Sequence, residues 1–160
     1  ANTFGQGISV TRYVLVSEAS IEDALGLLMR PYVVHGLVEH GRVIEVQPIP
    51  VSQVIKPETA RMLTEMLVTA VERGAPEALI EGYRVAGKTG TAQVPVPGGY
   101  HEAWTIASFA GYAPADDPAF VCLIKLDKPQ TSIWGAHVAA PVFREIAPRI
   151  LWRLGIPPDA

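Results

Sequence analysis

Apolar side chains recur at helical spacing in three stretches of the chain. The clearest, residues 57–73, predicts a helix that begins near Pro57 and is stopped by Gly74. A second helix is predicted over residues 141–154, and a weaker pattern covers residues 13–28. We expect the methionines of the first helix in the core. Its apolar stripe comprises Met62, Leu63, Met66, Leu67, Ala70 and Val71. One face of the second helix is lined by Val142, Ile146, Ile150 and Leu154.

Runs rich in β-branched residues predict strands elsewhere. Residues 31–47 hold two valine-rich runs around the turn signal His40-Gly41, which predicts a β-hairpin. Three further strands are predicted at about residues 83–92, 103–113 and 119–127. The linker "PADDP" between the last two is too short for a crossover helix, so these two strands should pair antiparallel. The elements together predict an α+β fold in which an antiparallel sheet packs with helices.

Composition narrows the classes of protein to consider. With 160 residues, of which 49% are apolar, the chain can bury one sizeable core, so we expect one domain or a large piece of one. The net charge of −3 is small and basic residues do not cluster, which argues against nucleic-acid binding. The longest uncharged apolar runs, such as "AFVCLI", are too short to span a bilayer, and the N-terminus has no signal-peptide pattern.

Cysteine and histidine indicate no metal site. The histidines are scattered and do not match the ligand spacing of known metal centres. Cys122 is the single cysteine and lies in an apolar stretch, so we expect a buried core thiol. Trp104 and Trp134 are expected to pack in the core or at the sheet edge rather than to line a cleft.

The stretch "GYRVAGKTGTAQ" at residues 82–93 fits two motifs. Gly82 to Thr89 matches the phosphate-loop pattern of nucleotide-binding proteins. That loop must lead into a helix whose N-terminus holds the phosphates, but "GTAQVPVPGGY" follows here, and its glycines, prolines and β-branched residues disfavour a helix. The match is therefore interpreted as accidental, and no nucleotide is expected.

The second motif is Lys88-Thr89-Gly90 on a strand. Side chains alternate along a strand, so Lys88 and Gly90 should point one way and Thr89 and Thr91 the other. Gly90 removes a side chain where a substrate would approach the backbone. Lys-Thr-Gly is a motif of β-lactamases and penicillin-binding proteins.

Five segments in order resemble the C-terminal half of the transpeptidase domain of class B penicillin-binding proteins, which belong to the β-lactamase-like superfamily: "FGQGISVT", "LLMRPYVV", "VAGKTGTAQ", "FAGYAPADDP" and "VAAPVFREI". The resemblance covers nearly the whole chain. It implies a single partial domain over 1–160, with a mainly helical segment and a small hairpin in 1–80, and three antiparallel strands and a C-terminal helix in 81–160.

The resemblance also implies an activity. A serine would attack a D-Ala-D-Ala stem peptide of peptidoglycan, release D-Ala and pass the acyl group to an amine, and β-lactams would acylate the same serine. Lys88 and Thr91 would be catalytic, the first through its charge and a hydrogen bond to a second serine, the second through an oxyanion-hole N–H. Thr89, Gly90 and Thr91 would bind substrate. No cofactor or metal is implied, and the parent protein would be anchored in the bacterial membrane, upstream of this chain, with this domain on the outer face.

The chain departs from the family at two places. Residues 12–26 do not follow the family's usual sequence. In addition, no serine is followed by lysine at the third position or by asparagine at the second, so the nucleophile motif Ser-x-x-Lys and the motif Ser-x-Asn are both absent. We interpret the chain as an inactive fragment of the enzyme that is prone to self-association. The alternative is a β-lactam sensor or a non-catalytic binding module on the same fold.

Overall fold

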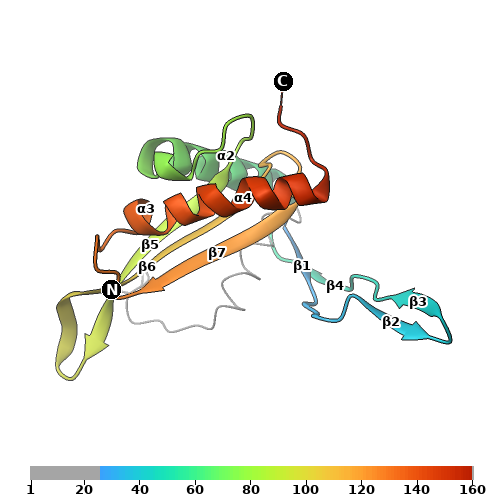
Figure 1. Ribbon diagram of the computed structural model, residues 1–160, viewed down its shortest axis with the longest axis horizontal. Helices are drawn as coiled ribbons and strands as arrows, with labels where there is room; N and C mark the ends of the chain where they lie inside the picture. Colours follow the sequence, from blue (N-terminus) through green and yellow to red (C-terminus); the bar gives the residue numbers. More distant parts are fainter. Residues whose placement is uncertain (1–25, 160) are drawn as a thin grey trace.

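The computed structural model describes residues 26–159 and confirms the α+β fold with antiparallel sheets and helices. The first part holds four short strands, and the second part holds a three-stranded sheet with its helices (Figure 1). The elements are β1 Leu27–Met29, β2 Gly36–Glu39, β3 Arg42–Glu45, β4 Pro50–Gln53, α2 Pro57–Gly74, the 3-10 helix η2 Pro76–Ala78, β5 Ala86–Val96, β6 Gly99–Ala113, β7 Phe120–Asp127, α3 Gly135–Val138 and α4 Ala140–Leu154.

The three-stranded sheet has the order β5-β6-β7 and is antiparallel throughout. The hairpin predicted across "PADDP" is therefore confirmed. The β5–β6 hairpin is longer than predicted, because β5 continues to Val96 and β6 begins at Gly99, with a turn at Pro97 and Gly98 between them. These two glycines have positive φ angles of 89° and 158°, which residues with side chains adopt rarely.

Helix α4 crosses one face of the sheet, with α3 directly before it (Figure 1). The core on this face centres on Phe143, whose ring meets Phe109 of β6 edge-on at 5.0 Å between centroids. The helix begins one residue before the predicted position and ends at Leu154, followed by Gly155, which has a left-handed φ of 73°. The predicted apolar face was wrong, because Ile146 and Leu154 are exposed. The buried positions of α4 are Ala140, Phe143, Ala147 and Leu151.

Helix α2 lies beside β5 and confirms the helix predicted over 57–73. Val68 and Val71 are buried, and they belong to two different clusters of the hydrophobic core. The methionines were predicted in the core, and this was wrong: Met62 and Met66 are each 61% exposed. Both lie on the side of α2 that the described residues leave uncovered, so apolar spacing alone overestimated the buried face.

The strands β1 to β4 form an arm that extends away from the sheet (Figure 1). Strands β2 and β3 confirm the hairpin predicted in 31–47, with His40 and Gly41 both at positive φ in its turn. Strands β1 and β4 pair with each other, and this pairing was not predicted. The helical pattern over 13–28 was wrong at its end, because Leu27 and Leu28 belong to β1; its remainder falls on residues 13–25, which are outside the described residues.

Cys122 lies on β7 and is half-buried against the core. Burial raises the pKa of its thiol, because the thiolate loses solvation. The thiol packs against the core, as predicted, but it is only partly buried. Among the helices of residues 26–159, none has the length and apolar character needed to cross a membrane.

Candidate functional site

The Lys-Thr-Gly triplet lies within β5, at an edge of the three-stranded sheet. Lys88 pairs with Ala110 and Gly90 with Ser108 on β6. The strand continues unbroken to Val96, so no helix follows the triplet. This confirms that the stretch lacks the strand–turn–helix geometry that a phosphate loop needs.

Lys88 has an exposed side chain beside helix α2. Its Nζ donates a hydrogen bond to the carbonyl oxygen of Thr89 at 3.0 Å, within the same strand. Lys88 and Thr89 line a pocket of about 400 Å³ together with Met66, Thr69 and Arg73 of α2. The triplet therefore borders an open pocket that has two cationic side chains, two hydroxyls and an apolar wall.

Gly90 lies directly opposite Ser108 of β6. A Cβ at this position would lie 2.6 Å from Ser108 Oγ, which is too close for a real contact. The Ser108 hydroxyl can rotate away, so packing between β5 and β6 does not by itself demand glycine at this position. The interpretation that Gly90 lets a substrate approach the backbone stays a prediction.

Thr91 contacts the start of helix α3. The backbone N–H of Gly135 donates to Thr91 Oγ1 at 3.1 Å. A Cβ on Gly135 would lie 2.4 Å from the carbonyl oxygen of Ser108 and 2.7 Å from that of Gly90, so only glycine lets α3 approach this closely. Sequence reasoning missed Gly135, and the glycine between Trp134 and the C-terminal helical pattern was the available signal.

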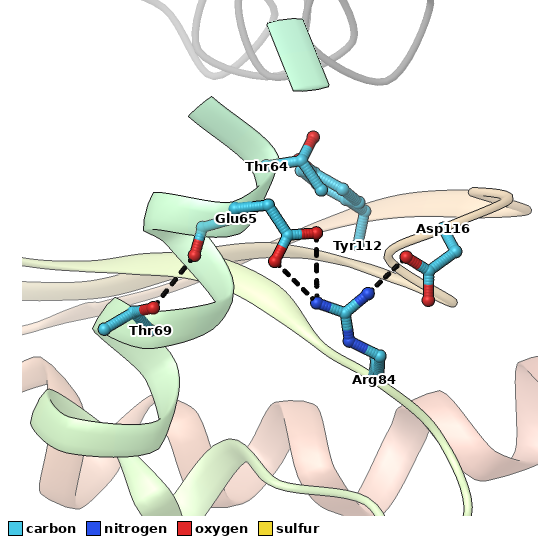
Figure 2. Close-up of polar contacts among 6 residues, drawn as sticks. All are labelled: Thr64, Glu65, Thr69, Arg84, Tyr112 and Asp116. Atoms are coloured by element: carbon cyan, nitrogen blue, oxygen red, sulfur yellow. Dashed lines mark hydrogen bonds and ion pairs between the residues drawn. The ribbon is translucent and has the colours of Figure 1, made fainter. Parts of the chain in front are cut away.

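An ion-pair network holds the segment that leads into β5 (Figure 2). The guanidinium of Arg84 donates to both carboxylate oxygens of Glu65 on α2, at 3.1 and 2.8 Å, and to Asp116 in the β6–β7 turn. These hydrogen bonds, with Asp116 contributing most, raise the pKa of Arg84. Beside them, Thr64 Oγ1 and Tyr112 OH are 2.9 Å apart. The network fixes α2 and the β6–β7 turn to the chain just before the triplet strand.

A second pocket, of about 350 Å³, is formed by β6 and the loop before α3. Trp104 lines it, stacks on His101 at 3.8 Å between ring centroids, and lies under Lys128 Nζ at 4.4 Å from its centroid. Trp104 and Trp134 were predicted to pack in the core or at the sheet edge. The core position was wrong, because the two side chains are 42% and 55% exposed. Trp104 instead forms a pocket wall near the end of the triplet strand.

Comparison with known proteins gives a consistent family match. The family model described as "Penicillin binding protein transpeptidase domain" matches residues 1–147. The chain is 40% identical to stage V sporulation protein D of Bacillus subtilis (strain 168), over 97% of this chain and 25% of that protein. It is 33% identical to peptidoglycan D,D-transpeptidase FtsI of Escherichia coli (strain K12), over 99% of this chain and 26% of that protein. The chain thus spans about a quarter of the length of these curated relatives.

Solved structures agree. The chain matches the apo form of penicillin binding protein 3 from Mycobacterium tuberculosis with a TM-score of 0.84 and 34% identity, covering 98% of this chain and 38% of that one. A structure of the same protein complexed with ampicillin also gives a TM-score of 0.84 and 34% identity, over 97% of this chain and 37% of that one.

Proposed function

Because this chain belongs to the family of penicillin-binding protein transpeptidase domains, we propose that it supplies the Lys-Thr-Gly strand of a serine D-Ala-D-Ala transpeptidase that cross-links peptidoglycan. The observation that carries the proposal is the placement of the triplet. It lies on an edge strand that pairs with another strand on one side only among the described residues, next to a pocket lined by Lys88 and Thr89. An open strand edge offers backbone groups that can pair with an extended peptide.

Each residue of the site has a proposed role. The ammonium group of Lys88 supplies positive charge beside the nucleophile and hydrogen-bonds to a second serine. Thr89 and Thr91 hold the terminal carboxylate of the substrate, while Gly90 keeps the strand free of a side chain. The N–H of Thr91 donates to the oxyanion of the tetrahedral intermediate, and the N–H of the nucleophile is the other donor.

The proposal extends to partners and location. Stem peptides of peptidoglycan and β-lactams are the proposed ligands, and the structure of the Mycobacterium tuberculosis relative with ampicillin supports the second. Peptidoglycan lies outside the cytoplasm, so we place the domain on the outer face of the bacterial membrane, in a protein anchored through a segment outside this sequence.

The 160-residue chain alone should form no covalent adduct with a β-lactam. None of its serines stands in Ser-x-x-Lys or Ser-x-Asn, so the proposal places the nucleophile in a part of the protein outside this sequence. Fluorescent penicillin followed by a denaturing gel should label the full-length protein and leave the isolated chain unlabelled. A labelled band from the isolated chain that survives boiling would contradict this assignment, and an unlabelled full-length protein would contradict the proposed function.

The isolated chain should also self-associate. Strand β7 is at the other edge of the sheet and pairs on one side among the described residues, and its apolar side chains are half-buried. Lys125 is an exposed charge on this edge. An open apolar edge favours pairing with a second copy, and exchange of α4 is a second route. Light scattering after size-exclusion chromatography should show a mass that increases with concentration. A monomer at every concentration would refute the expectation.

A further inference from the structure

Three polar side chains outside the triplet form a chain of contacts around helix α3. His137 belongs to α3, Ser132 to the loop before it and Glu77 to η2. His137 Nδ1 is 3.4 Å from Ser132 Oγ, and His137 Nε2 is 3.8 Å from Glu77 Oε1. The contacts therefore link three segments that surround the beginning of α3.

The chain of contacts lies next to the point where α3 meets the triplet strand. Two residues before His137, the N–H of Gly135 donates to Thr91 Oγ1, and the Gly135 backbone is packed closely on the carbonyls of Gly90 and Ser108. The N–H of Trp134 donates to Ser132 Oγ at 3.3 Å. A displacement of α3 would therefore move the N–H that orients the Thr91 hydroxyl.

The carboxylate of Glu77 favours a contact between η2 and α3. Its Oε2 atom is buried and has no hydrogen-bond partner within residues 26–159, while its Oε1 faces His137. A buried carboxylate oxygen that lacks a partner is costly, so the carboxylate favours any nearby donor. His137 Nε2 is the polar group that faces this carboxylate, 3.8 Å from its other oxygen, and the contact links α3 to η2.

A serine that contacts a histidine, which in turn contacts a glutamate, also resembles the arrangement that activates a catalytic serine. The geometry does not fit that role. The distance of 3.4 Å between Ser132 and His137 is long for a proton transfer between oxygen and nitrogen. Ser132 Oγ is also engaged as the acceptor of the Trp134 N–H. The arrangement is suited to holding backbone in place.

We propose that Glu77 and His137 are positioning residues that seat α3 on the triplet strand and thereby orient the Thr91 hydroxyl toward the carboxylate of a stem peptide or β-lactam. The inference rests on the proposed function. The inference predicts an effect that differs from that of Lys88. Orientation of a carboxylate-binding group acts on ligand binding, whereas Lys88 acts on the chemical step in the proposed function.

The test uses three substitutions of His137 in the full-length protein. Glutamine places an N–H near the position of Nε2 and keeps the contact with Glu77, whereas asparagine reaches only the position of Nδ1 and keeps the contact with Ser132. Alanine removes both. The rate of acylation is measured against the concentration of a fluorescent penicillin, which gives a half-saturating concentration and a limiting rate.

His137→Ala should raise the half-saturating concentration by about 3- to 10-fold, the effect of one lost polar contact, and change the limiting rate by less than about 2-fold. His137→Gln should restore the half-saturating concentration, and His137→Asn should resemble alanine. The control Arg149→Gln, which breaks the exposed 3.3 Å pair with Glu145 on α4, should behave as the wild type.

Several outcomes would overturn the inference. An unchanged half-saturating concentration in His137→Ala would overturn it. Equal half-saturating concentrations for the glutamine and asparagine variants would also overturn it, and this comparison remains valid if the alanine variant unfolds. A fall in the limiting rate alone would assign His137 to the chemical step instead. Failure of the wild type to be labelled would overturn the proposed function itself, and this inference with it.

Discussion

Replacement of Lys88 by alanine in the full-length protein should slow acylation by a β-lactam by about 100- to 10,000-fold. The ammonium group lies beside the pocket, and in the proposed role it stabilises charge that develops on the reacting groups, so its loss should act mainly on the transition state. Its hydrogen bond in the structure goes to Thr89 within the same strand. Removal of an exposed strand lysine should change the free energy of unfolding by less than about 0.5 kcal/mol.

Lys125 provides a matched control for Lys88. It is an exposed lysine of the same sheet, and it pairs with Ser108, the residue that pairs with Gly90 on the other side. Lys125→Ala should be acylated at the wild-type rate, as measured by the appearance of the fluorescent adduct with time. Equal acylation rates for the two variants would remove Lys88 from the site.

Replacement of Phe143 by alanine should lower the free energy of unfolding of the chain by about 3–5 kcal/mol. The side chain of Phe143 is fully buried, and its ring centroid is 5.0 Å from that of Phe109 and 6.1 Å from that of Phe120. The truncation leaves a cavity between α4 and the sheet, which the rigid strands cannot fill. Urea unfolding at one fixed, low protein concentration measures the change.

Trp152 on the same helix is the control for this truncation, because it is 81% exposed. Trp152→Ala should change the free energy of unfolding by less than about 0.5 kcal/mol. The sheet-facing side of α4 would be wrongly assigned if Trp152→Ala destabilised the chain as much as Phe143→Ala.

The strands were largely predictable, because short linkers and β-branched runs constrain them locally. The linker "PADDP" fixed an antiparallel pair, and His40-Gly41 marked a hairpin turn that the structure contains. The pairing of β1 with β4 was not predictable in this way, since the β2–β3 hairpin and its flanking loops separate the two strands in sequence.

The helices were predictable in extent but not in orientation. Each carries apolar residues over more of its circumference than the sheet covers, so spacing alone does not choose the buried side. On α4 the sheet contacts the side with Ala140 and Ala147, because small residues allow close approach, and Phe143 fills the remaining space. On α2 the exposed Met62 and Met66 show the same excess of apolar surface.

The candidate site was only partly visible in the sequence. The triplet carries its own motif, so Lys88 to Thr91 could be selected from the letters alone. The contact between Gly135 and Thr91 joins residues 44 positions apart, and it depends on how α3 lies over the sheet. The linkage of Glu77 to His137 likewise arises only when η2 and α3 pack together.

Release of D-Ala by the full-length protein tests the central claim most directly. With a synthetic stem peptide that ends in D-Ala-D-Ala and an amine acceptor, the full-length protein should release D-Ala and form the cross-linked product. Prior treatment with penicillin should abolish both. Stoichiometric labelling by penicillin without any release of D-Ala would contradict the transpeptidase proposal and would indicate a β-lactam sensor on the same fold.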